Sequence, residues 1–504
     1  MSIAAARRPL VRLAVPRRLA ARRIPRTGLL CALVAFLNAA CWSVITPPFQ
    51  APDEPSHFAY VQLLAETGRL PTSSGFAFSQ EEEAALSDLR QSEVRWHPEV
   101  KTISSPAQLQ RLHRDLASPL SRIGRGGAGA ATGEPPAYYA LATIPYYLGS
   151  GGTLLERLEL MRLLSALMGG LTALFCYLFV REALPGAPWA WAVGGLAVAL
   201  FPLFGFTSGA VTPDAMLFAV SAATFYCLAR AFRRGLARRL AVAIGALTAL
   251  GLLTKLNFVG LVPGVLLALA ILAYRGVRPR AGAPSSKRAL GSATLASAIA
   301  LSPVCVYALH NLSQHRPLFG RLSEAVHHSI AGQSLIGEAS YVWQLYLPRL
   351  PGMASYFPGL SPTRELWFDR AVGLYGWLDT AFPPWVYDFA LVAAGLIAAL
   401  AVGALIEKRH ALRRRVPELV VYLVMTAGVL VLVGVSSNMA AAVEGTAYAQ
   451  PRYLLPMLAL FGAALTLAAR GARRWGPAIG CLLVILVLAQ DLFSQLQVIA
   501  RFYG

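Results

Sequence analysis

Two adjacent carboxylates, Asp53 and Glu54, stand between two prolines in the segment PPFQAPDEPSHFAYVQLL, residues 47 to 64. Because proline fixes the backbone dihedral φ, we expect this segment to be rigid. A carboxylate held in place could take the proton of an attacking hydroxyl, which is general base catalysis. The same residues also suit a helix start, with Pro55 in the first turn and an acid capping free amides. The acid pair with His57 close by favours a catalytic role for Asp53.

Two cations lie in or beside apolar stretches of the sequence. Lys255 belongs to LLTKLNFVGLVPG, residues 252 to 264, and Arg452 to AQPRYLLPML, residues 449 to 458. A cation in hydrocarbon is costly unless it is paired or reaches the interface. Both could bind a phosphate, and a fixed cation stabilises the charge that develops on a departing phosphate. Interfacial anchoring is the alternative for each.

Three further segments combine acidic or aromatic residues with prolines. VTPDAMLF, residues 211 to 218, reads as a helix start, so capping is the leading alternative there. RAVGLYGWLDTAFPPWVY, residues 370 to 387, suits an aromatic belt at a membrane surface. EPPAYYALATIPYYL, residues 134 to 148, is too short to span a bilayer and is expected at its outer interface. The candidates for lining a substrate site are His57, Asp214, Tyr138, Trp377, Asp379 and Tyr453.

Metal and disulfide chemistry have weak support. His327 and His328 form a pair, but no third ligand stands at a spacing typical of metal sites, so assistance by a divalent cation is left open. The six cysteines lie in or beside apolar stretches and match no metal or redox pattern. We therefore expect neither a disulfide nor a zinc site.

The elements that must position these residues are membrane helices. Hydrophobic residues make up 56% of the chain and charged residues 14%, which would leave a soluble protein with an insoluble surface. About eleven apolar stretches approach the roughly 20 residues that cross a bilayer. The sequence therefore predicts an all-α polytopic membrane protein. Its net charge of +20 sits in short loops rather than along one face, which argues against nucleic acid as a partner.

The positions of the basic loops set the expected topology. Arginine and lysine cluster at alternate ends of successive spans, so the positive-inside rule puts the N-terminus in the cytoplasm. Abundant arginine and alanine are typical of GC-rich bacterial genomes, and we expect a bacterial inner-membrane location. The expected divisions are a basic cytoplasmic N-terminus (1–28), an uncleaved first transmembrane helix (29–47), a first extracytoplasmic loop with amphipathic and interfacial helices (48–156), transmembrane helices 2–7 (157–309), a second large extracytoplasmic loop (310–385), and transmembrane helices 8–11 with a short tail (386–504).

Five segments in this order, PDEPSHF, EPPAYY, TPDA, GLYGWLD and QPRYLLP, resemble the bacterial membrane family known as domain of unknown function 2142. The resemblance spans about residues 30 to 470. The acid pair after the first span also resembles the type C (GT-C) glycosyltransferases, which use polyprenyl-phosphate sugars at the outer membrane face. These resemblances imply a GT-C-like fold, Asp53 as catalytic acid or base with Glu54 beside it, and a donor phosphate near Lys255 and Arg452.

The leading hypothesis is transfer of a sugar from a polyprenyl-phosphate donor to a cell-envelope glycan, lipid or protein, by inverting displacement on the extracytoplasmic face. It requires the acid pair and the two cations to converge in one pocket. A transporter or flippase of lipid-linked glycans is the first alternative, although no internal repeat is evident and transporters often have duplicated halves. A non-catalytic envelope-assembly protein is the second alternative.

Overall fold

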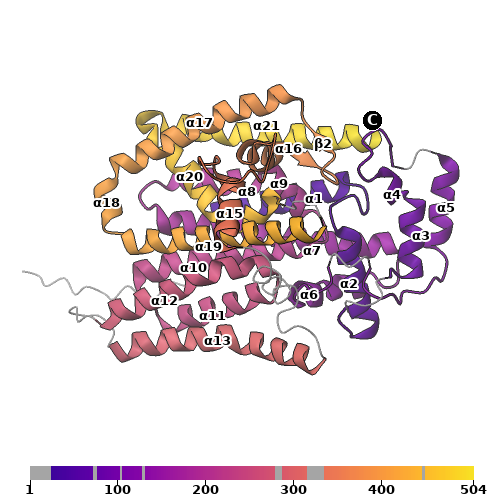
Figure 1. The fold of residues 1–504 in the computed structure, drawn as a ribbon, viewed down its shortest axis with the longest axis horizontal. Helices are drawn as coiled ribbons and strands as arrows, with labels where there is room; N and C mark the ends of the chain where they lie inside the picture. Colours follow the sequence, from indigo (N-terminus) through magenta and orange to yellow (C-terminus); the bar gives the residue numbers. More distant parts are fainter. Residues whose placement is uncertain are drawn as a thin grey trace, which may run out of the picture.

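The computed structural model describes residues 24–71, 77–102, 105–127, 131–277, 286–314, 334–444 and 449–504 of the 504-residue chain. The expected histidine pair and most of the expected basic N-terminus lie outside these ranges. The described residues are mostly helical (Figure 1). Two short antiparallel strands, β1 (Leu374–Tyr375) and β2 (Thr380–Ala381), form a small hairpin.

Among the described residues, nine segments are long and apolar enough to cross a membrane. They are Arg26–Ile45, Leu154–Ala183, Pro213–Arg234, Leu256–Arg275, Ala289–Ser313, Pro384–Glu407, Val416–Ala441, Pro451–Gly471 and Arg473–Tyr503. The helices α8 (Pro188–Ala199) and α9 (Pro202–Ser208) follow each other with a bend of 57°. If this bent pair is one span, the described residues contain ten candidate spans. The prediction of a polytopic all-α membrane protein is confirmed. The count falls below eleven because α11 (Arg238–Leu252) has only 15 residues, about 22 Å of helix.

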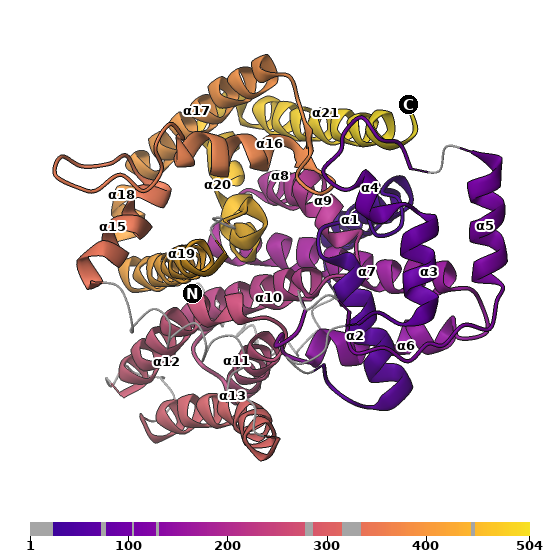
Figure 2. The ribbon, with the colours of Figure 1, turned by 45° about the vertical axis from the view of Figure 1, so that its right-hand side comes forward.

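The bundle is built from long helices that run side by side (Figures 1 and 2). Its elements are α1 (Arg26–Ile45), α7 (Leu154–Ala183), α8 to α9, α10 (Pro213–Arg234), α11, η1 (Leu256–Leu261), α12 (Val262–Val277), α13 (Ser286–Ser313), α17 (Pro384–Glu407), α18 (Arg409–Arg413), α19 (Val416–Glu444), η3 (Pro451–Met457), α20 (Leu458–Gly471), η4 (Arg473–Trp475) and α21 (Gly476–Tyr503). Helix α7 packs on α1 and α10. Small residues permit the close contacts, as where Gly170 of α7 faces the backbone of Ala32 in α1.

Five helices between the first two spans gather at one end of the bundle, on the right in Figures 1 and 2. They are α2 (Glu54–Thr67), α3 (Gln80–Asp88), α4 (Gln91–Val94), α5 (Pro106–Leu116) and α6 (Ala137–Leu148). Capping boxes start α5, with Ser105 and Gln108, and α7, with Thr153 and Glu156. Helix α2 lies on α6 and α3 lies on α5, so these helices cover the end of the bundle where α7 begins.

The connection before α17 forms a second group of short elements. It contains α15 (Leu335–Tyr346), η2 (Pro362–Asp369), α16 (Arg370–Gly373) and the β hairpin. Helix α16 contacts α9 and η3. This placement carries the hairpin toward the start of α2, where Trp377 Nε1 donates a hydrogen bond to the Phe49 carbonyl oxygen at 3.3 Å.

Candidate functional site

The turn between α1 and α2 holds Asp53 in an unusual backbone conformation. Asp53 has a φ of 65° and Phe49 a φ of 63°, both in the left-handed region that non-glycine residues rarely adopt. Asp53 occupies the N-cap position of α2, yet its side chain makes no capping hydrogen bond. Such local strain persists only where the surroundings enforce it. The carboxylate of Asp53 is therefore directed away from the helix start and toward another element.

That element is η3, at the start of the span that ends in α20. Arg452 Nη2 donates to Asp53 Oδ2 at 2.7 Å, and the side chains are 10% and 33% exposed, respectively. The Nε atom of Arg452 is buried and has no hydrogen-bond partner among the described residues. The guanidinium therefore holds Asp53 with one nitrogen and keeps a donor for another group.

A second ion pair lies beside the first. Lys255, the residue before η1, places Nζ 2.9 Å from Oδ1 of Asp214, near the start of α10. Thr212 rather than Asp214 caps α10, because its hydroxyl accepts from the Asp214 amide at 3.3 Å. The Lys255 ammonium also lies 5.9 Å from the ring centroid of Tyr453, the residue after Arg452. The two ion pairs thus meet around Tyr453.

The charges of this cluster act on one another. Burial alone would raise the pKa of Asp53, but the positive charges of Arg452 and Lys255 outweigh it and hold that pKa below its ordinary value. Burial lowers the pKa of His57 to about 3, against the opposing attraction of Asp53. At neutral pH, Asp53 is therefore a carboxylate and His57 a neutral imidazole.

Glu54 has a different environment from its neighbour. It is fully buried and receives a bidentate pair from Arg162 of α7, at 2.8 and 2.7 Å. Its oxygens also accept from the amides of Phe49 and Val211, both at 3.0 Å. Arg162 in turn donates to the carbonyl oxygens of Ser43 at the end of α1 and of Thr46 and Pro47 in the turn, and it also pairs with Glu159 at 3.1 Å. Glu54 and Arg162 therefore tie the turn of Asp53 to α7 and to the start of α10.

The aromatic segment at the start of α6 supports the same turn from another side. A 2.9 Å hydrogen bond joins His57 Nδ1 to the Tyr139 hydroxyl, and Tyr139 stacks on Tyr60 with centroids 3.7 Å apart. The Ala137 amide donates to the Leu253 carbonyl at 2.9 Å, which fixes α6 against the turn before Lys255. Tyr138 is fully buried, and its hydroxyl bonds Ser165 at 2.8 Å.

The remaining candidates divide between this cluster and a neighbouring one. Trp377 contacts the turn through Phe49, and the guanidinium of Arg95 lies 4.4 Å from its ring centroid. Asp379 instead pairs with Arg501 of α21 at 3.2 Å. Arg501 also binds carbonyl oxygens of the α4 region, those of Val94, His97 and Val100. Asp379 therefore helps to fasten the C-terminal helix to the end of the bundle.

A pocket opens beside Arg452 and exposes a residue that sequence reasoning missed. Its lining includes Pro52, Thr212, Gln450, Arg452 and Arg370. Arg370 begins α16 and makes no ion pair or hydrogen bond with the described residues. Burial lowers the pKa of Arg370, and the opposing charge of Glu365 does not outweigh it. The pocket thus presents two guanidinium groups beside Asp53.

Arg162 was also missed, although the sequence held a signal for it. It lies within the apolar stretch of α7, where an ionisable residue predicts a buried partner. Arg370 had no such signal, because it stands in a segment of mixed composition. For metal ions, the described residues contain no group of three or more histidine, cysteine, aspartate or glutamate side chains that could hold one.

The fold and this cluster define a class, a membrane-embedded helical protein with paired charges where several spans begin. The family model described as "Predicted membrane protein (DUF2142)" matches residues 36–461, and the chain belongs to this family. No curated protein matches the sequence.

Solved structures of oligosaccharyltransferase from Archaeoglobus fulgidus are similar over most of the chain. The crystal structure in complex with Zn and sulfate is 12% identical, covering 94% of this chain and 52% of that one, with a TM-score of 0.42. The enzyme AglB in complex with an inhibitory peptide and a dolichol-phosphate is 13% identical, covering 95% and 56%, with a TM-score of 0.45. This chain spans about half the length of those proteins.

Proposed function

We propose that this protein transfers a sugar from a polyprenyl-phosphate donor to a cell-envelope acceptor. The observation that carries the proposal is the Asp53–Arg452 ion pair, held at 2.7 Å beside a pocket and next to the Lys255–Asp214 pair. A carboxylate and several cations are the groups that such a transfer needs, since a hydroxyl loses a proton and a phosphate leaves.

Asp53 serves as the base in this proposal. An acceptor hydroxyl attacks the anomeric carbon, the bond from that carbon to the phosphate oxygen breaks, and the hydroxyl proton passes to the Asp53 carboxylate. The electron pair of the broken bond leaves with polyprenyl phosphate. Attack opposite the leaving group inverts the anomeric configuration. Because the pKa of Asp53 is lowered, its carboxylate is ionised before the reaction and can accept the hydroxyl proton.

Arg452, Lys255 and Arg370 bind the donor phosphate in the proposal. Arg452 has an unused buried donor atom, and Arg370 has no carboxylate partner among the described residues. A phosphate that drew Arg452 toward it would loosen the Asp53–Arg452 pair and raise the pKa of Asp53, making it a stronger base. Glu54 is then a positioning residue, because its own oxygens are occupied by Arg162 and two backbone amides.

The remaining candidates have supporting roles in the proposal. His57 contacts the acceptor or supports Asp53 as a neutral imidazole, and Tyr453 lies over the two cations. Trp377 and Tyr138 shape the wall behind the turn, and Asp379 fixes α21. Whether a divalent cation assists stays open.

We also propose that the site faces the outside of a bacterial inner membrane, with the N-terminus in the cytoplasm. The support is the distribution of arginine: spans that begin near the Asp53 cluster end in arginine at the other end, as α10 does at Arg233 and Arg234. Lipid-linked sugars presented on the outer face would then meet Asp53.

The test is sugar transfer in membranes that contain the full chain with the Asp53→Asn substitution. Labelled sugar from a polyprenyl-phosphate donor is followed into membrane acceptors. Transfer at the unsubstituted level by Asp53→Asn would overturn the proposal. The matched control is Asp388→Asn, which also removes a carboxylate from an arginine pair, with Arg364, on an exposed surface. The control is expected to transfer normally.

A further inference from the structure

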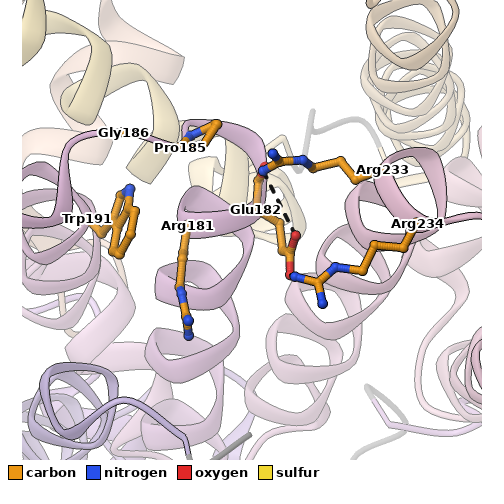
Figure 3. Close-up of a pocket in the computed structure, with 7 residues that line it drawn as sticks. All are labelled: Arg181, Glu182, Pro185, Gly186, Trp191, Arg233 and Arg234. Carbon is orange, nitrogen blue, oxygen red and sulfur yellow. Dashed lines mark hydrogen bonds and ion pairs between the residues drawn. The ribbon is translucent and has the colours of Figure 1, made fainter. Parts of the chain in front are cut away.

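A second polar cavity lies at the far end of the helices that carry the candidate site. It has a volume of about 470 Å³ and is lined by the last turns of α7 and α10, the following loop and the start of α8. Figure 3 shows Glu182 between Arg233 and Arg234 on one side, with Arg181 and Trp191 on the other. The lining residues are Arg181, Glu182, Pro185, Gly186, Trp191, Arg233 and Arg234.

A neighbouring cavity of about 230 Å³ shares two of these residues, Pro185 and Arg233. It adds Phe232 from α10, Arg275 from the end of α12, Arg414 and Arg415 from the connection between α18 and α19, and Glu418 from the first turn of α19. Arg415 also donates to the Ala183 carbonyl oxygen, which joins this connection to the end of α7. The two cavities therefore form one basic recess, here called the arginine recess, between α7, α8, α10, α12 and α19.

The arginine recess carries a large surplus of positive charge. Six arginines and two glutamates line it. Both glutamates are already paired with arginines of the recess. Glu182 accepts a hydrogen bond from Arg234 at 2.7 Å, and Glu418 accepts two from Arg415 at 2.9 and 2.7 Å. Arg181, Arg275 and Arg414 have no carboxylate partner among the described residues. Three guanidinium groups are thus left to bind an anion.

Aromatic rings complete the recess in the way expected at a membrane interface. The Arg181 guanidinium lies 5.7 Å from the centroid of Trp191, and that of Arg275 lies 5.6 Å from Phe232. Trp191 Nε1 donates to the Leu184 carbonyl oxygen at 2.9 Å, which holds the ring at the rim. Rings and guanidinium groups together suit an amphipathic ligand with a charged head.

The position of the recess separates it from the candidate site. Helix α10 begins at Pro213, next to Asp214, and ends at Arg234, and its 22 residues correspond to about 33 Å of helix. That length matches the thickness of the hydrocarbon region of a bilayer. The recess therefore lies at the opposite membrane interface, where phospholipid headgroups are concentrated.

We propose that the arginine recess binds the phosphate headgroup of an anionic membrane phospholipid. Guanidinium groups match phosphate oxygens in geometry and charge, and basic pockets between membrane helices select anionic headgroups. The proposal depends on the membrane embedding of the chain and not on the proposed sugar transfer, so each can fail alone.

The test titrates the detergent-purified full chain with dioleoylphosphatidylglycerol and follows bound lipid by native mass spectrometry. The double variant Arg181→Gln, Arg414→Gln is expected to bind about 30-fold more weakly, since each cation near a membrane surface contributes about fivefold. Each single variant is expected to lose about fivefold. The matched control is Arg111→Gln, Arg114→Gln, which removes two arginines from α5 and should bind lipid normally.

Three outcomes would overturn the assignment. The first is equal affinity of the double variant and the unsubstituted chain for the lipid. The second is equally tight binding of dioleoylphosphatidylcholine, whose headgroup has no net charge. The third is displacement of the anionic lipid by inorganic phosphate at equal concentration, which would identify a soluble anion as the occupant. Neither arginine substituted in the double variant has a carboxylate partner among the described residues, so the variant is expected to fold.

Discussion

Asp53 and Arg452 are 399 residues apart in the sequence, and their side chains form a 2.7 Å hydrogen-bonded ion pair. The pair joins the turn after the first span to the start of α20. A contact of this range exists only in the assembled bundle, because the helices between the two residues must first pack. The pair therefore reports on both the fold and the proposed chemistry.

Replacement of Asp53 by Asn should lower sugar transfer about 100-fold to 10,000-fold, the range for loss of a general base. The measurement is initial rate with labelled donor, with Asp388→Asn as the control. Since the Asp53 side chain is one-third exposed, the thermal midpoint should change little. Full activity in Asp53→Asn would contradict the assigned role.

Replacement of Arg452 by Gln should raise the KM for the donor about 10-fold to 100-fold, through loss of a charged hydrogen bond to phosphate. It should also move the acidic limb of the kcat/KM profile to higher pH. The limb moves to higher pH because Arg452 lowers the pKa of Asp53. Without Arg452 the pKa of Asp53 rises, and Asp53 becomes protonated at a higher pH. An acidic limb that stays in place would show that Asp53 does not control it.

Variants of Lys255 and Asp214 can distinguish a structural role of this ion pair from a role of Lys255 in binding the donor phosphate. Lys255→Gln alone should destabilise the protein, because it leaves the buried Asp214 carboxylate without its ammonium partner. Combining it with Asp214→Asn should restore most of the thermal midpoint but not transfer, if the ammonium binds the donor phosphate. Restored transfer in the double variant would assign the pair a structural role only.

The buried pair of Glu54 and Arg162 should matter chiefly for stability. Glu54→Ala removes the bidentate carboxylate from a fully buried guanidinium, which keeps only its pair with Glu159 at 3.1 Å, and the change costs about 3–5 kcal/mol. The double variant Glu54→Leu, Arg162→Met should recover part of that loss, because it removes both charges. Thermal midpoints in one detergent provide the comparison. Equal midpoints for Glu54→Ala and the unsubstituted chain would contradict the buried pair.

Close packing of η1 on α19 should hold Lys255 in position. A Cβ added at Gly428 would collide with the backbone carbonyl of Gly260, so Gly428→Ala should destabilise the protein by about 1–3 kcal/mol. Gly395→Ala in α17 is the matched control, since open space surrounds that position. The difference between the two thermal midpoints measures the contact, and equal midpoints would argue against it.

Much of the architecture could be predicted because each membrane span is a local property of the sequence. Apolar stretches of about 20 residues specify helices without reference to the rest of the chain. The exception, α11, shows the limit: a helix flanked by neighbours in a bundle can be shorter than an isolated span. Its partners, not its own residues, decide where it lies.

The site was harder to predict from the sequence, because the residues in contact with one another are far apart along the chain. Motif spacing singled out Asp53, Lys255 and Arg452, but it gave no partner for any of them. The sequence placed Asp53 and Glu54 side by side as catalytic candidates, although Asp53 is one-third exposed and pairs with Arg452, while Glu54 is fully buried against Arg162. That difference follows from the left-handed φ of Asp53, which turns adjacent side chains in different directions.

The proposed transfer requires the donor phosphate to bind between Arg452 and Lys255, beside Asp53. Density for polyprenyl phosphate in a cryo-electron microscopy structure of the full chain would show where the phosphate binds. We predict a phosphate in contact with the Arg452 guanidinium and the Lys255 ammonium, with the Asp53 carboxylate released from Arg452. A phosphate bound elsewhere, with the Asp53–Arg452 pair still closed, would contradict it.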